Sequence, residues 1–156
     1  YLTGLWFEGS RDSSKHTIDC EEKELEIFKE TERWLDIYFS GKNPDFVLKY
    51  KIEKLTPFRK QVIDIMNKIP YGKTITYNDI AKEIANLKGI ERMSAQAVGG
   101  AVGWNPICII IPCHRVVGTN GSLTGYGGGI KNKIALLMHE KNDISKYFVP
   151  KRGTAL

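Results

Sequence analysis

Hydrophobic and polar positions alternate at the start of the chain and then change to helical spacing. Residues 1–9 alternate well enough to predict one strand of a sheet. The polar stretch 10–20 should be a loop. Over residues 21–39, apolar side chains recur every three or four positions, which predicts a helix that packs one face on the sheet. Turn-forming residues at 41–45 should end this helix, and residues 46–52 should form a further strand.

The second part of the chain has the pattern of three helices and one buried strand. Residues 56–69 combine a Thr-Pro start with one apolar stripe. Thr76 and Asp79 have the spacing of a capping box, which predicts a second helix from that point. A third helix, over residues 94–102, consists mainly of small side chains. Two short helices joined by a glycine-containing turn are the outline of a helix-turn-helix, although ordinary helix pairs share that outline. The apolar run 107–111 predicts a buried strand.

Composition narrows the class of protein. The chain has 156 residues, 42% of them hydrophobic, which is enough for one sizeable core and a small second lobe. No apolar run reaches the length of a membrane span and no cleavable signal opens the sequence, so we expect a soluble intracellular protein. The cysteines Cys20, Cys108 and Cys113 do not have the spacing of a zinc site with the scattered histidines, so neither a metal nor another cofactor is expected.

Charge is divided unevenly along the chain. Residues 1–55 contain nine Lys/Arg and twelve Asp/Glu, a net charge of −3, whereas residues 56–156 contain fourteen and six, a net charge of +8. This asymmetry suits a C-terminal module that contacts phosphate and an N-terminal lobe that does not. Ordinary charge for solubility would explain it equally well.

The segment 111–118 contains the residues with the clearest chemical potential. Cys113 stands beside His114 and Arg115 at the end of the apolar run. A free thiol with a pKa near 8.5 is only about 3% thiolate at pH 7, so a reactive cysteine needs nearby positive charge or a base. Two such neighbours are adjacent here, which indicates a nucleophile. The competing interpretation is an inert buried cysteine at the end of a strand.

The surrounding motifs resemble the active site of the O6-alkylguanine-DNA alkyltransferases, which are suicide DNA-repair proteins. The resemblance is carried by Asn105-Pro106, the apolar run, Pro112-Cys113-His114-Arg115, Gly125-Tyr126-Gly127-Gly128 and His139-Glu140. A looser resemblance extends through Thr56-Pro57-Phe58 to Trp6-Phe7-Glu8-Gly9 and so covers nearly the whole chain.

The resemblance implies an α/β (α+β) fold in two domains. Residues 1–54 would be a small sheet-plus-helix lobe of the ribonuclease H-like type, truncated at its start because the family has earlier strands. Residues 55–156 would be a mainly helical domain that carries the helix-turn-helix and the active-site cysteine loop.

The resemblance also implies the chemistry of the site. Cys113 would accept the alkyl group by direct SN2 attack, His114 would take the thiol proton through a water molecule, and Glu140 would hold the imidazole. Asn105 would support the reactive loop from the turn that precedes it. Tyr77 would donate a proton toward N3 of the departing guanine.

Further residues would shape the substrate pocket. Gly127, after Tyr126, would offer its N–H toward O6, while the carbonyl oxygens of Cys113 and Val116 would accept from the exocyclic amine of guanine. Cys108 replaces a pocket-wall proline of some relatives, which should change the bulky O6 substituents that fit.

The small-residue helix would enter the minor groove of DNA while the target base turns out into the pocket. Gln96 stands where many relatives have an arginine that fills the space left by the flipped base, and Arg92 is a second candidate for this plug. The residues expected at DNA are Arg92, Ser94, Ala95, Gln96, Ala97, Gly99, Gly100 and Arg115. Arg115 is also expected to anchor the reactive loop internally, and phosphate contacts are expected from Lys73, Lys88, Arg92 and Lys131.

The expected function is therefore stoichiometric repair of O6-alkylguanine in double-stranded DNA by a monomer, in the cytoplasm and at the nucleoid or, in a eukaryote, in the nucleus. Three alternatives are a lesion-flagging relative without transfer, a cysteine hydrolase and a helix-turn-helix regulator. The presence of Cys113 argues against the first alternative. A hydrolase base normally comes from a distant segment, and a regulator would need base-reading side chains on the third helix.

Overall fold

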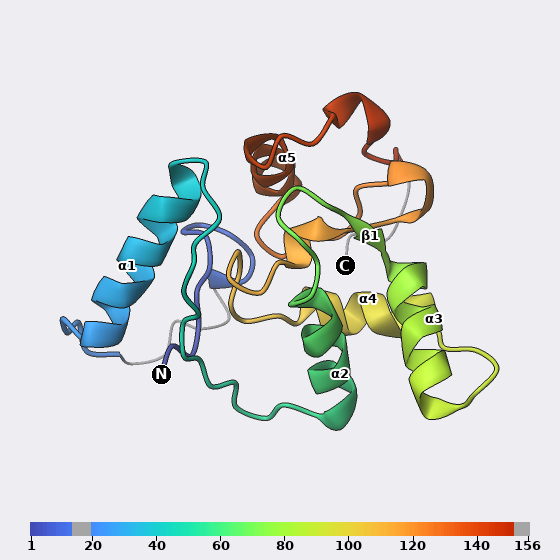
Figure 1. The fold of residues 1–156 in the computed structure, drawn as a ribbon, viewed down its shortest axis with the longest axis horizontal. Helices are drawn as coiled ribbons and strands as arrows, with labels where there is room; N and C mark the ends of the chain where they lie inside the picture. The colour runs from blue at the N-terminus through green and yellow to red at the C-terminus, as the bar shows by residue number, and fades with distance from the viewer. Residues whose placement is uncertain (14–19, 152–156) are drawn as a thin grey trace.

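The computed structural model describes residues 1–13 and 20–151, and Figure 1 shows how their elements are arranged. Five α-helices, two short strands and three short 3-10 helices follow in chain order within this described part: α1 (Glu26–Phe39), α2 (Pro57–Met66), β1 (Ile75–Thr76), α3 (Tyr77–Lys88), α4 (Ala95–Gly103), η2 (Cys113–Arg115), β2 (Val116–Val117), η3 (Thr119–Gly121), α5 (Ile130–His139) and η4 (Ile144–Lys146). The fold is thus mixed and mainly helical with a small sheet.

The N-terminal part contains less regular structure than the alternating pattern predicts. The predicted strands 1–9 and 46–52 are wrong, because in the described residues their backbones pair only at isolated bridges, one of which joins Leu2 to Tyr50. Helix α1 begins at Glu26 rather than at residue 21, and its N-cap Leu25 offers no side-chain acceptor. Of the predicted loop 10–20, residues 10–13 form a turn and residues 14–19 lie outside the described part.

The helices of the C-terminal part begin where their caps predict. The Thr56 side chain accepts from the N–H of Arg59 at the start of α2. Thr76 and Asp79 form the reciprocal capping box of α3, with bonds of 3.0 and 2.8 Å. Ser94 caps α4 by accepting from the N–H of Ala97. Because side-chain caps are local interactions, they could be identified without knowledge of the tertiary structure.

Helices α2, α3 and α4 lie together on the right of Figure 1, while α1 stands on the left. The parallel pair β1–β2 aligns Ile75 with Val116, which brings the first residue of α3 beside the segment that follows Cys113. One hydrophobic core joins the two sides, and it includes both Tyr38 of α1 and Ile80 of α3. Among the described residues, no helix is both long and apolar enough to cross a membrane.

Candidate active site

Cys113 begins the short helix η2 and is 4% exposed. The run 107–111 before it is a turn rather than the predicted strand, and Ile109 has a φ of +70°. The amide Nδ2 of Asn105 explains this conformation, since it donates to the carbonyl oxygens of Ile107 and Ile111 at 3.2 and 3.1 Å. These two bonds fold residues 107–111 into a turn, and the Cys113 side chain then points toward the Asn105 amide.

The thiol of Cys113 has a polar environment despite its burial. Asn105 Nδ2 lies 3.1 Å from Cys113 Sγ, and the thiol of Cys108 donates toward the same sulfur. The hydrogen bond from Cys108 lowers the pKa of Cys113, burial opposes this effect, and Asn105 and the cation of Lys133 add to it. The pKa of Cys108 is raised, because its thiol is a donor in this pair and is itself buried. The arrangement therefore favours the thiolate on Cys113 alone.

His114 is fully buried next to Cys113 and contacts Glu140, with 2.7 Å between Nε2 and Oε1. Burial lowers the pKa of His114, and Glu140 only partly opposes this effect. A neutral imidazole that donates from Nε2 to Glu140 leaves Nδ1 as an acceptor. Nδ1 is buried and has no hydrogen-bond partner in the described part of the chain. The ring can thus accept a proton on Nδ1.

Glu140 is the centre of a buried network of donors. Arg115 Nε donates to Oε1 and Oε2 at 3.1 and 2.9 Å, and Arg115 Nη2 adds a bond of 2.9 Å to Oε1. The N–H of Gly72 donates to Oε2, and the hydroxyl of Tyr38 donates to Oε1 at 2.8 Å. Burial raises the pKa of Glu140, but the bonds from His114 and Arg115 outweigh it and lower the pKa to about 2. Glu140 is therefore a carboxylate at any working pH.

Arg115 lies in this network and not on the DNA-facing surface proposed for it. Its Nη1 donates to the carbonyl oxygen of Ile69 at 2.8 Å, and its other nitrogens bind Glu140. The expectation that Arg115 contacts DNA is corrected by this geometry, whereas its role as an internal anchor of the loop agrees with the structure.

Lys133 of α5 is a fully buried cation near Cys113 that sequence reasoning missed. Its Nζ donates to the carbonyl oxygens of Val116 and Thr124 at 2.6 and 3.5 Å. Burial lowers the pKa of Lys133 to about 8, and Cys113 opposes that shift. A signal was available in the sequence, because Lys133 shares the buried helical face of Leu136 and Leu137 at spacings of three and four.

Tyr77 is the first residue of α3, and its hydroxyl donates to the carbonyl oxygen of Thr124 at 3.4 Å. Burial and the neighbouring Cys113 raise the pKa of Tyr77 to about 12, so it keeps its proton. Lys133 Nζ lies 5.8 Å from the centre of the Tyr77 ring. The carbonyl oxygen of Val116, expected to meet guanine, already accepts from this lysine.

The cavity at Cys113 has a volume of about 10 Å³, which is room for roughly one water molecule. The Tyr126 hydroxyl faces the thiols of Cys108 and Cys113, without hydrogen-bond geometry to any described residue. The Asp12 carboxylate lies so close to Gly127 that a side chain at position 127 would collide with it at its Cβ atom. The cavity is lined by Asp12, Val102, Gly103, Asn105, Cys108, Cys113, Gly125, Tyr126 and Gly127. Asp12, which sequence reasoning missed, therefore closes one side of the cavity.

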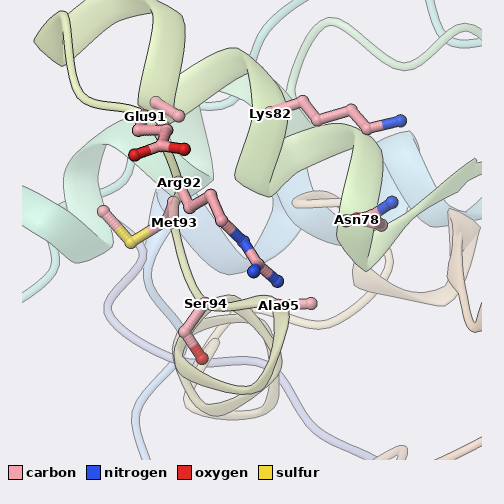
Figure 2. A pocket seen from close by; sticks show the side chains of 8 residues that line it. Asn78, Lys82, Glu91, Arg92, Met93, Ser94 and Ala95 are labelled. Atoms are coloured by element: carbon pink, nitrogen blue, oxygen red, sulfur yellow. The ribbon is translucent and has the colours of Figure 1, made fainter.

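A second, larger hollow of about 680 Å³ lies between α3 and α4. Figure 2 shows Arg92 reaching from the connection between the two helices toward the start of α4, with Lys82 and Asn78 on α3. Gln96, Ala97 and Gly100 are exposed on α4 next to this region, and Ser94 is exposed at its cap. Ala95 is half-buried, and Gly99 is buried and does not lie on the exposed face.

The fold and site together define a class of protein, in which a pair of helices with a face of small residues lies beside a buried cysteine whose pKa is lowered. Comparisons with known proteins give the family. Residues 57–142 match the family described as 6-O-methylguanine DNA methyltransferase, DNA binding domain. The chain belongs to this family.

Relatives with known functions and structures support this assignment. The methylated-DNA--protein-cysteine methyltransferase of Methanosarcina acetivorans is 47% identical over 115 residues, which are 74% of this chain and 70% of that protein. The crystal structure of Mycobacterium tuberculosis OGT in complex with DNA superposes with a TM-score of 0.65 at 42% identity, covering 77% of this chain and 69% of that one. The O6-methylguanine-DNA methyltransferase of Pyrococcus kodakaraensis gives 0.60 at 28% identity, covering 83% and 72%.

Proposed function

We propose that this protein repairs O6-methylguanine in DNA by transferring the methyl group irreversibly to Cys113. The observation that carries the proposal is the buried Cys113 thiol, held by Asn105 at 3.1 Å and adjacent in sequence to a His114–Glu140 pair. The same site lies within the part of the chain that matches the methyltransferase family. The names of the relatives indicate the substrate, and the geometry around Cys113 indicates a thiol nucleophile that suits this substrate.

The reaction follows from the groups present. His114 Nδ1, which has no hydrogen-bond partner among the described residues, takes the thiol proton through one water molecule. The sulfur of Cys113 then attacks the methyl carbon, so that an S–C bond forms while the C–O6 bond breaks. The electron pair stays on guanine, and the Tyr77 hydroxyl, which keeps its proton, stabilises the developing charge by donating a hydrogen bond at N3. As the base departs, guanine takes up a proton from solvent and His114 releases its own to solvent. The thioether has no leaving group for a second cycle, so each molecule acts once.

Binding of the DNA would use the exposed face of α4. Its small residues allow close approach to the sugar-phosphate backbone, and the alkylated base would leave the stack for the pocket at Cys113. Gln96 would fill the gap, while Arg92 and Lys82 near the helix pair would contact phosphates. The partner would be double-stranded DNA that contains O6-alkylguanine, bound by a monomer.

Two domains are proposed for the chain, residues 1–54 and 55–156. The first would be a ribonuclease H-like lobe, which α1 and the bridge between Leu2 and Tyr50 support, whereas Leu5 forms a bridge with Ile107 of the second domain. The second would carry both DNA binding and alkyl transfer, because α2, α3, α4 and the cysteine loop all follow residue 55.

The proposal is tested with duplex DNA that carries a tritiated O6-methylguanine. Label should move to the protein once per molecule, and intact-mass and peptide spectra should place one methyl group on Cys113. Cys113→Ser should transfer nothing yet bind the same duplex, since DNA binding does not use the sulfur. Methyl groups on Cys108 or Cys20, or repeated turnover, would contradict the mechanism.

A further inference from the structure

Tyr38 lies near the end of α1, in the N-terminal part of the chain, and is fully buried. Its hydroxyl donates to Glu140 Oε1, the same oxygen that His114 Nε2 contacts. We propose that Tyr38 is a positioning residue for the transfer reaction, which acts through Glu140 to keep His114 in its neutral, proton-accepting form. This inference rests on the proposed function, because it concerns the base that activates Cys113.

The direction of the Tyr38 hydroxyl is fixed by packing on several sides. Its ring stacks on Trp34, with 5.6 Å between ring centres, and meets Tyr71 edge-on at 5.9 Å. The carbonyl oxygen of Tyr38 also contacts His139 Nε2 at 2.6 Å. A side chain held in this way keeps its hydrogen bond without paying rotational entropy for it at each encounter with substrate.

The hydroxyl is a permanent donor. Burial and the charge of Glu140 both raise the pKa of Tyr38, so the phenol stays protonated throughout the working pH range. A protonated phenol next to a carboxylate can only give its hydrogen to that carboxylate, and it therefore takes up part of the negative charge of Glu140.

The effect on His114 follows from this charge. A carboxylate beside an imidazole stabilises the imidazolium, and each further donor to the carboxylate weakens that support. Several other titratable or charged groups of the described residues lie around His114, Glu140 and Tyr38. They are Tyr71, Arg115, Lys133 and His139, in addition to Tyr38 itself. Arg115 and Lys133 disfavour a second positive charge at His114, and Tyr38 acts in the same sense from α1. The N-terminal part would thereby keep His114 ready to accept the thiol proton.

The test compares Tyr38→Phe with Tyr71→Phe. Both changes remove one phenol hydroxyl and keep the ring, but among the described residues the Tyr71 hydroxyl donates to the carbonyl oxygen of His139, at 3.4 Å, and not to Glu140. The single-turnover rate of methyl transfer to Cys113 is measured from pH 5 to 9 on the full chain. In Tyr38→Phe the acid limb should move up by about 0.5–1 pH unit, which gives a loss that reaches roughly three- to tenfold at the acid end of the range and a change of less than about twofold at pH 8.5.

Tyr71→Phe should follow the wild-type profile. A Tyr38→Phe profile lowered equally at every pH, or one identical to wild type, would show a purely structural role and overturn the proposal. A nuclear magnetic resonance titration of His114 in the wild-type protein is independent of the variants' folding. A His114 pKa at or above its ordinary value of about 6.5 would also overturn it. Failure of the wild-type protein to accept methyl at any pH would instead refute the proposed function.

Discussion

Replacing Glu140 with glutamine removes the charge at the centre of the site while keeping the shape of the side chain. The wild-type carboxylate accepts from Tyr38, Gly72, His114 and Arg115, whereas a glutamine oxygen can accept from only part of this set. The glutamine NH₂ would also face donors. The Arg115 side chain is only 10% exposed and would lose its counter-ion.

The magnitude follows from the buried ion pair. Breaking such a pair on one side costs about 3–5 kcal/mol, so Glu140→Gln should lower the free energy of unfolding by that amount at neutral pH. Methyl transfer should fall by about 100-fold, because the base at His114 loses its orientation. The measurements are urea unfolding and the single-turnover rate, with Glu53→Gln as the control because Glu53 is exposed.

The dependence on pH gives a sharper test. The folded-state pKa of Glu140 lies at about 2, below its ordinary 4.5, so the ionised carboxylate stabilises the fold above pH 4.5. That contribution, on the order of 3 kcal/mol, is lost as the pH falls from about 4.5 to about 2. The stability difference between wild type and Glu140→Gln should therefore narrow over this window. A difference that stays constant, or one below about 1 kcal/mol at neutral pH, would refute the reasoning.

Three further changes probe the plug, the buried cation and the closed cavity. Gln96→Arg should speed repair of duplex DNA and Gln96→Ala should slow it, with the rate on free O6-methylguanine unchanged; a wild-type duplex rate for Gln96→Ala would exclude this residue as the plug. Lys133→Met should raise the pKa of Cys113 and lower the methyl-transfer rate at pH 7 by about tenfold, and the rate should recover at higher pH. The pKa of Cys113 is measured from the rate of iodoacetamide labelling as a function of pH. Asp12→Ala should speed alkylation by free O6-benzylguanine several-fold, while Glu8→Ala, an exposed acid of the same segment, should not; equal rates would mean that another segment opens the cavity.

The parts of the fold that local chemistry determines could be predicted from the sequence. Thr56, Thr76 and Ser94 mark the starts of their helices because a cap involves neighbours three residues apart. The run 107–111 has the composition of a strand, and the bonds made by Asn105 override that tendency.

The contacts that complete the site depend on tertiary structure. Tyr38 and Glu140 are 102 positions apart, and nothing in the helical pattern around Tyr38 distinguishes it from an ordinary core residue. Asp12 reaches Gly127 from the opposite end of the chain, within a segment that looks like a polar loop. Such partners become visible only when the two parts of the chain are placed together.

The tight cavity at Cys113 has a consequence for the spent protein. A methyl group added to the sulfur needs more space than about 10 Å³, so the alkylated side chain must push against its neighbours. The thioether also accepts hydrogen bonds poorly, which weakens the contacts from Asn105 and Cys108. Overpacking of this kind costs about 1–3 kcal/mol. Methylation of Cys113 should therefore lower the stability of the protein interior. The methylated protein should unfold and be degraded sooner than the unmodified protein.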